Sequence, residues 1–140
     1  MILGLDLGSK CGWSLPTGEG EWTLRGNRNQ RLVQFHDRLD ALLKDNLALE
    51  LVAFERPFAR GDAATRSLWG LAGMVEYLAD RHGYSTIDYP PSTLKKWFVG
   101  HGQADKGSMY ETAIMLGYDV KISHEHAVDA IAVRLYAEAH

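Results

Sequence analysis

Asp6 interrupts an apolar run, ILGLDL, and a glycine turn follows it at once. A buried carboxylate is costly to desolvate unless a cation or a metal pairs with it. Two more acids occupy comparable places: Glu55 ends the apolar run LVAFE, and Asp129 is flanked by apolar residues in HEHAVDAIAV. His126 precedes Asp129 by three positions, so the two lie on one face of a helix. We therefore predict that these four side chains meet at one site.

The chemistry expected of such a cluster is metal binding and phosphodiester hydrolysis. Carboxylates this close repel one another, and bound divalent cations relieve the repulsion. Oxygen-rich ligation favours Mg²⁺, with Mn²⁺ able to substitute and slightly favoured by the imidazole. Two ions can hold the scissile phosphate, activate a bound water and stabilise the leaving 3′ oxygen. In this scheme Asp6 bridges the two ions, and Glu55, His126 and Asp129 are the flanking ligands.

Each of these residues also has a structural interpretation. Asp6 could accept hydrogen bonds from the backbone of the turn that follows it. Glu55 could pair with a neighbouring arginine on the surface. His126 could make a local hydrogen bond in the first turn of its helix, and the ligand could instead be His124 or Glu125.

The elements that must position these residues form an α/β pattern. Short apolar runs predict strands at 2–7, 11–16, 20–25, 49–55 and 84–89. Helical periodicity predicts helices at 32–46, 63–82, 93–99, 105–116 and 123–139. This order predicts a mixed five-stranded sheet that begins with an antiparallel meander. The carboxyl ends of neighbouring strands converge on one crevice of such a sheet, where we expect the acidic cluster.

Local signals mark several boundaries of these elements. A turn is expected at 17–20, between the second and third strands. Gly83 is expected to end the second helix, and Ser92 to cap the third after Pro90 and Pro91.

Composition limits the class of protein. A chain of 140 residues, 46% of them hydrophobic, can build one core, so we expect one domain over residues 1–140. Cys11 is the only cysteine, which excludes an intrachain disulfide and favours a reducing cytoplasm, with Cys11 as a small buried hydrophobe. No apolar run is long enough for a membrane helix, and no targeting segment is visible. The net charge of −3 argues mildly against a DNA-binding role, although later basic residues could form one basic side.

Four segments, in order, resemble the successive motifs of the RuvC-type Holliday-junction resolvases: GLDLGSKCGWSL, AFERPF, VGHGQADK and HEHAVDAIAV. The resemblance spans nearly the whole chain and implies a single RNase H-like nuclease domain of the retroviral integrase superfamily, with helices on both faces of the sheet. It also implies a homodimeric, Mg²⁺-dependent endonuclease of DNA recombination and repair, which nicks two opposed strands of a four-way junction symmetrically. Asp6, Glu55, His126 and Asp129 fall on the metal-binding positions of that family.

The same resemblance assigns residues that contact DNA. Lys95 and Lys106 match catalytically important lysines near the DNA backbone, although such lysines are most often plain solvated charges. Phe58 matches an aromatic that stacks on bases at the junction centre, and its place among arginines in a polar loop fits this role better than a core position. The full expected set is Phe58, Arg56, Arg60, Arg66, Lys95, Lys96 and Lys106.

A dimer contact is implied on the helix at 63–82. Gly70, Ala72 and Gly73 of this helix would allow a second helix to approach closely, or could simply pack against the sheet. A two-fold dimer would present two identical sites to a nearly two-fold symmetric junction.

Other functions are compatible with parts of the pattern. A broader branched-DNA or flap endonuclease and an RNase H-type nuclease would use the same ligand set. A catalytically inactive junction-binding protein would be expected to lack a carboxylate, and none is missing. An Hsp70-like or sugar-kinase ATPase would open with a similar strand but needs a second domain. The compact chain without a basic tail favours a phage-encoded enzyme that acts in the cytoplasm of a bacterial or phage-infected cell.

Overall fold

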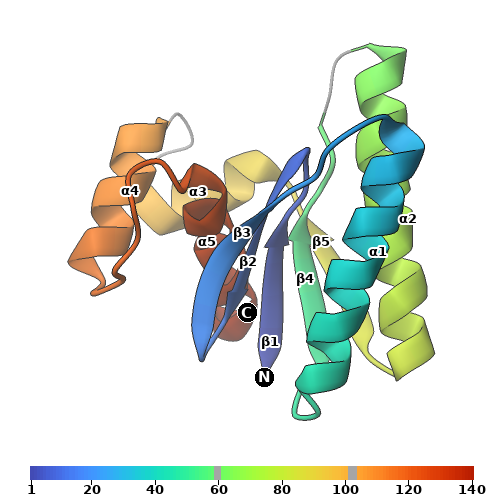
Figure 1. The fold of residues 1–140 in the computed structure, drawn as a ribbon. Helices are drawn as coiled ribbons and strands as arrows, with labels where there is room; N and C mark the ends of the chain where they lie inside the picture. Colours follow the sequence, from blue (N-terminus) through green and yellow to red (C-terminus); the bar gives the residue numbers. More distant parts are fainter. Residues whose placement is uncertain (59–60, 101–103) are drawn as a thin grey trace.

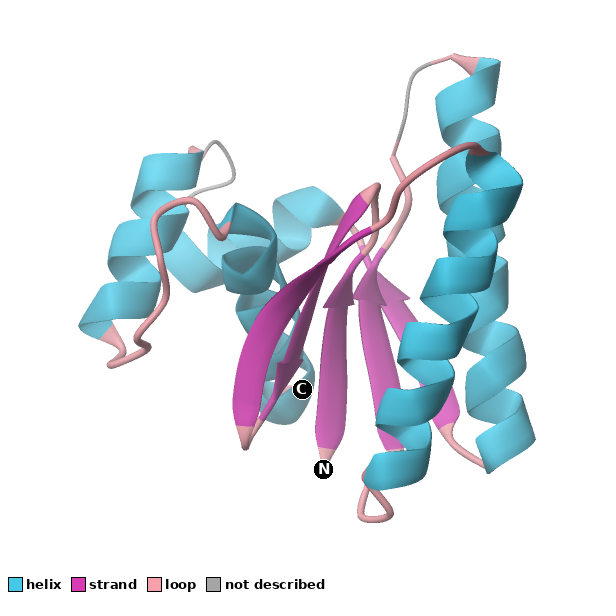
Figure 2. Ribbon diagram, in the orientation of Figure 1, coloured by secondary structure: helices cyan, strands magenta, loops and turns pink. Residues whose placement is uncertain are grey.

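A computed structural model describes residues 1–58, 61–100 and 104–140. Within these residues the chain forms a five-stranded sheet flanked by helices (Figures 1 and 2). The elements in chain order are β1 (Ile2–Asp6), β2 (Lys10–Leu15), β3 (Gly18–Thr23), α1 (Arg28–Asp45), β4 (Leu51–Glu55), α2 (Asp62–His82), β5 (Ser85–Tyr89), α3 (Pro91–Val99), α4 (Lys106–Met115) and α5 (Glu125–Ala139). Among the described residues, no helix combines the length and the apolar composition that crossing a membrane would require.

The sheet is mixed, as the sequence predicted, with strand order β3-β2-β1-β4-β5. β1 pairs antiparallel with β2 and parallel with β4, and β4 pairs parallel with β5. Because β1 and β4 are parallel neighbours, their carboxyl ends lie at the same edge of the sheet. The apolar runs of both strands follow from this central position, where both faces of a strand are covered.

Helices cover both faces of the sheet. α1 and α2 lie on one face, and α5 lies on the other with α3 and α4 (Figure 1). Leu3 and Leu5 of β1 belong to the core beneath α1 and α2. Successive side chains of a strand point to opposite faces, so Gly4 and Asp6 face α5. The alternation of β1 therefore decides which helix can meet the Asp6 carboxylate.

Two glycines let α5 approach the sheet closely. A Cβ atom at Gly4 would collide with the carbonyl oxygen of Ala130, and one at Gly12 with the carbonyl oxygen of His126. Only a residue without a side chain fits beneath the helix backbone at these two places. The close approach brings the first turns of α5 to the end of β1.

The predicted turn at 17–20 is wrong, because the hairpin between β2 and β3 is tighter. Leu15 pairs with Gly18, and Trp13 pairs with Gly20, so both glycines lie within β3. Gly20 accommodates the indole of Trp13, whose Nε1 atom would lie 2.8 Å from a Cβ atom at that position. This glycine makes room for an aromatic side chain and forms no turn.

The predicted cap of α3 is also wrong. The helix begins at Pro91, with Pro90 in the N-cap position, and Ser92 lies inside the first turn. Proline suits the first helical position because its fixed φ is helical and its missing N–H would have no partner there.

The remaining helices match their predicted positions, with shifted ends. Gly83 ends α2 in the left-handed conformation, as expected. α1 begins earlier than expected because Asn27 and Gln30 form a capping box that the hydrophobic spacing does not reveal. α4 and α5 begin slightly later than expected, at Lys106 and Glu125. Cys11 is buried, as predicted.

Candidate metal centre

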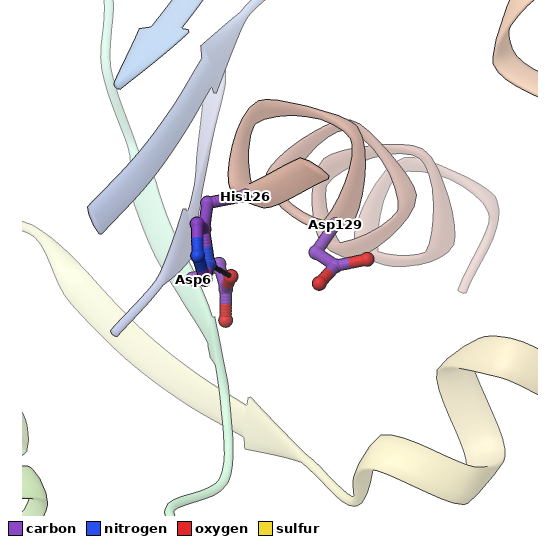
Figure 3. A group of neighbouring side chains, drawn as sticks. All are labelled: Asp6, His126 and Asp129. Atoms are coloured by element: carbon purple, nitrogen blue, oxygen red, sulfur yellow. Dashed lines mark hydrogen bonds and ion pairs between the residues drawn. The ribbon is translucent and has the colours of Figure 1, made fainter. Parts of the chain in front are cut away.

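Three elements bring the acidic side chains together. Asp6 ends β1, Glu55 ends the parallel neighbour β4, and His126 and Asp129 lie in the first turns of α5. Figure 3 shows His126 and Asp129 on the side of α5 that faces Asp6. The convergence thus follows from a parallel strand pair and from a helix packed against glycines.

The ligand atoms lie within the span of one metal site. Asp6, His126 and Asp129 each offer one such atom, and these atoms all lie within 4.8 Å of one another. The Nδ1 atom of His126 is 2.8 Å from Oδ2 of Asp6 (Figure 3). The Glu55 carboxyl lies near enough to Asp6 for each of the two to perturb the pKa of the other. The structure therefore brings Asp6, His126 and Asp129 within the reach of one cation and places Glu55 beside Asp6.

Burial perturbs the acids of this cluster. Desolvation raises the pKa of Asp6 to about 6, although the hydrogen bond from His126 opposes the rise. Burial, together with the charge of Asp6, raises the pKa of Glu55 to about 8. Burial and the charge of Glu55 raise the pKa of Asp129 to about 7. The hydrogen bond to Asp6 raises the pKa of His126. Without a cation, the cluster therefore holds protons near neutral pH that ordinary carboxylates would release.

This donor set fits a divalent cation. Asp6 is only 5% exposed, and its neighbours, His126 at hydrogen-bond distance and Glu55, are themselves candidate ligands. A cation among these acids would relieve the repulsion that contributes to the raised pKa values of Glu55 and Asp129. Carboxylate oxygens with one imidazole nitrogen suit Mg²⁺ or Mn²⁺.

The ambiguity among the three residues at the start of α5 has a structural answer. His126 points to Asp6, whereas Glu125 pairs with Lys106 through Oε2 and Nζ, 3.0 Å apart. His124 occupies the N-cap position, and its side chain makes no capping hydrogen bond. His126 is therefore the member of the three that contacts Asp6, and Glu125 lies next to it, with Oε1 3.5 Å from Nε2 of His126.

Glu21 is a positioning residue that the sequence did not reveal. Its Oε2 atom accepts hydrogen bonds from the backbone N–H groups of His126, at 2.8 Å, and Ala127, at 3.1 Å. Glu21 lies on β3, so this side chain caps α5 from 105 positions away in the sequence. A local capping motif would have been visible in the sequence, but this contact exists only in the folded chain. It fixes the end of the helix that carries His126.

Among the described residues, Asp6 does not pair with the backbone of the turn and Glu55 does not pair with Arg56, whereas Arg60, the other arginine considered for Glu55, lies outside them. The Asp6 carboxyl contacts His126 and Glu55 instead of closing the turn that follows β1. The neighbouring Arg56 pairs with Asp88, with Nη2 and Oδ1 3.1 Å apart.

Several predicted DNA-contacting residues surround the cluster. A cavity of about 260 Å³ is lined by Lys95, Lys106 and Asp129, and a second of about 250 Å³ by Phe58, Lys95 and Glu55, among others. Lys95 lies close enough for its charge to oppose the upward pKa shift that burial causes in the acids. Phe58 is 77% exposed, which suits a stacking surface better than a core position.

The other predicted contacts lie further out or outside the described residues. Arg56 also lines the second cavity, whereas Arg66 and Lys96 are exposed and line neither of the two. Arg60 lies outside the described residues, as do His101, Gly102 and Gln103 of the third motif.

A mixed sheet of this order, with an acidic cluster at the carboxyl ends of its central strands, is the arrangement expected of nucleases with an RNase H-like fold. No protein-family model matches the chain. Curated relatives do: it is 31% identical to the crossover junction endodeoxyribonuclease RuvC of Zymomonas mobilis, over 96% of this chain and 88% of the relative. It is 32% identical to the RuvC of Anaeromyxobacter dehalogenans, over 95% of this chain and 78% of the relative.

Solved structures agree on the fold. Thermus thermophilus RuvC in complex with a Holliday junction substrate superposes with a TM-score of 0.80 at 23% identity, over 99% of this chain and 94% of that one. Another structure of Thermus thermophilus RuvC gives a TM-score of 0.77 at 22% identity, over 99% and 95% of the two chains. The chain belongs to the RuvC family of crossover junction endodeoxyribonucleases.

Proposed function

We propose that this RuvC-family endonuclease resolves four-way DNA junctions in recombination and repair, by paired symmetric nicks made through metal-dependent hydrolysis. What supports the proposal is that Asp6, His126 and Asp129 lie together at the edge of the sheet where Glu55 ends the neighbouring strand. The relatives are named crossover junction endodeoxyribonucleases, and a structural neighbour is bound to a Holliday junction substrate. We further propose the bacterial cytoplasm as its place of action, because these relatives are bacterial.

The proposed cofactor is Mg²⁺, two ions per site, with Mn²⁺ able to replace it. When bound, such ions neutralise charge at the scissile phosphate and lower the pKa of a bound water. Asp6 would be the central residue in holding the ions, because it contacts His126 and lies beside Glu55. Glu55, His126 and Asp129 would hold the flanks. Asp6 is buried and the three flanking residues are partly buried, which limits their contact with bulk water and strengthens the electrostatic interactions within the site.

The surrounding side chains would hold the DNA. Lys95 lies beside the acids and would face the reacting phosphate. Lys106 is 79% exposed and held by Glu125, so it can exchange this partner for a DNA phosphate. Phe58, exposed at the end of β4, would stack on bases near the junction centre.

We propose a homodimer that forms through α2. The small residues of α2 have different surroundings. Ala72 is fully buried beneath the helix, whereas Gly73 is exposed, and a Cβ at its position would meet open space. Trp69 and Tyr77, one turn on either side of Gly73, are 48% and 53% exposed. Large aromatic side chains beside an open glycine suit a helix-to-helix contact.

The test compares the wild-type protein with Asp6→Asn on labelled four-way, Y-shaped and linear duplexes and on an RNA–DNA hybrid, with Mg²⁺, Mn²⁺ or EDTA. Paired symmetric nicks confined to four-way DNA, dependent on metal and absent in the variant, support the proposal. Equal cutting of Y-shaped DNA would indicate a broader branched-DNA nuclease, and cutting of the hybrid an RNase H-type enzyme. Binding without cutting would indicate an inactive junction-binding protein.

A further inference from the structure

A separate cavity of about 340 Å³ lies beside the acidic cluster. It is lined by Gly8 and Ser9 of the turn after β1, by Arg28 and Arg31 of α1, and by Ser67 and apolar residues of α1 and α2. Figure 1 shows these three segments at the edge of the sheet where β1 ends. The four segments that resemble the resolvase family contain none of the cavity residues that lie on α1 or α2.

The two arginines of this cavity lack carboxylate partners. Both are half-buried, and neither forms an ion pair with any residue that the structure describes. Arg31 donates one hydrogen bond, from Nη1 to the carbonyl oxygen of Gly26 at 2.7 Å, and the described residues provide none for Arg28. The described lining contains no acidic residue, in a chain with 18 acids and a net charge of −3. A half-buried guanidinium group without a carboxylate partner is stabilised when an anion binds to it.

The position of the cavity identifies the anion. Ser9 follows Asp6 by three residues, so the cavity begins within about 10 Å of the acidic cluster. Phosphates along one DNA strand recur about every 3.4 Å of helix axis. If one phosphate of a DNA strand lies at Asp6, another phosphate of the same strand, at most about three nucleotides away, can therefore reach the cavity. Arginine forks and serine hydroxyls are common donors to phosphate oxygens.

We infer that Ser9, Arg28, Arg31 and Ser67 form a pocket for a backbone phosphate of the strand being cut. This inference rests on the proposed function, because the ligand is the DNA substrate itself. Lys95 lies on α3, on the face of the sheet that α5 covers, whereas α1 lies on the opposite face (Figure 1). Lys95 and the pocket would thus hold the DNA strand on either side of the scissile phosphate. The pocket would fix which phosphate of the strand lies at the acidic cluster.

The experiment measures binding of a labelled four-way junction between 50 and 200 mM salt, in the non-cleaving Asp6→Asn background. Arg28→Gln is the main variant, because the loss of Arg28 breaks no hydrogen bond among the described residues. It should weaken binding about 3- to 10-fold and reduce the slope of log affinity against log salt by about one. Arg28→Lys should keep the slope, since a lysine also neutralises a phosphate. Arg38→Gln, an exposed arginine on the same helix outside the cavity, is the matched control and should change neither quantity.

Uncharged methylphosphonates at single positions of the cleaved strand locate the phosphate. A methylphosphonate at one position, within about three nucleotides of the cut, should weaken the binding of the Asp6→Asn protein. The same methylphosphonate should not weaken binding further when the protein also carries Arg28→Gln. The inference is wrong if Arg28→Gln matches Arg38→Gln in affinity and slope, or if every methylphosphonate affects both proteins equally. The proposed function fails separately, if the wild-type protein neither binds nor cuts the four-way junction.

Discussion

Replacing Asp6 with asparagine should stabilise the metal-free protein at pH 8 while it abolishes cleavage. The carboxyl of Asp6 is 5% exposed and lies among other acids, so its ionised form is costly in the folded state. Asparagine has nearly the same shape and keeps an oxygen that can accept the hydrogen bond from His126. The substitution therefore removes the buried charge with little change in packing.

The size of this effect follows from the pKa. Burial raises the pKa of Asp6 from 3.8 to about 6, so the folded state keeps a proton that the unfolded chain loses. Stability is therefore lost as the pH rises between about 4 and 6, by about 3 kcal/mol in all. The hydrogen bond that His126 makes with a neutral amide is weaker than the one with a carboxylate. This loss offsets about 1 kcal/mol of the stability gained by removing the charge. We expect Asp6→Asn to be more stable by about 2 kcal/mol at pH 8, or about 6 °C in Tm.

The assay is thermal and urea unfolding at pH 4 and pH 8, in EDTA and in Mg²⁺. The variant's advantage should appear at pH 8 in EDTA and vanish near pH 4. Mg²⁺ should stabilise the wild-type protein but not the variant, whose cleavage rate should fall about 1000-fold. Asp40→Asn is the control of opposite sign, because hydrogen bonds from His82 and Lys44 hold the pKa of Asp40 at about 2. The reasoning is refuted if Asp6→Asn is the less stable protein at pH 8 in EDTA.

Three further changes test how the site is positioned. Gly12→Ala should displace α5 and lower the cutting rate at least 100-fold, whereas Gly18→Ala, whose Cβ would lie 4.0 Å from Trp13, should cut normally. Single-turnover cleavage of a four-way junction measures both rates. Glu21→Ala should lower the free energy of unfolding by about 1 kcal/mol and slow cleavage. Glu21→Gln keeps an acceptor oxygen, so it should retain most of the wild-type stability and most of the cleavage rate. Trp69→Glu should yield monomers in sedimentation and single nicks in place of paired ones; a dimer that still cuts in pairs would contradict the proposed interface.

The sequence predicted the fold well where its signals are local. The apolar runs around Asp6 and Glu55 identified buried strands, and the acid at the end of each run indicated a site at their carboxyl ends. Gly83 marked a helix end because a left-handed residue after a helix favours glycine. The turn at 17–20 was misplaced because Gly20 makes room for the Trp13 ring, a contact across the hairpin.

Features that depend on tertiary contacts had no signal in the sequence. Glu21 is an ordinary strand residue until α5 packs above it and offers two backbone N–H groups. Arg28 and Arg31 resemble solvated helix charges, and only the fold places them beside the turn that follows Asp6. The sequence thus indicated the candidate ligands themselves, whereas the residues that orient them and hold the substrate emerge from the assembled structure.

The most direct test of the metal centre is anomalous diffraction from crystals of the wild-type protein grown with Mn²⁺. We expect an Mn²⁺ peak within about 2.2 Å of a carboxylate oxygen of Asp6, with further ligands from among Glu55, His126 and Asp129. An Mn²⁺ ion bound elsewhere, or no peak beside Asp6 at saturating Mn²⁺, would contradict it.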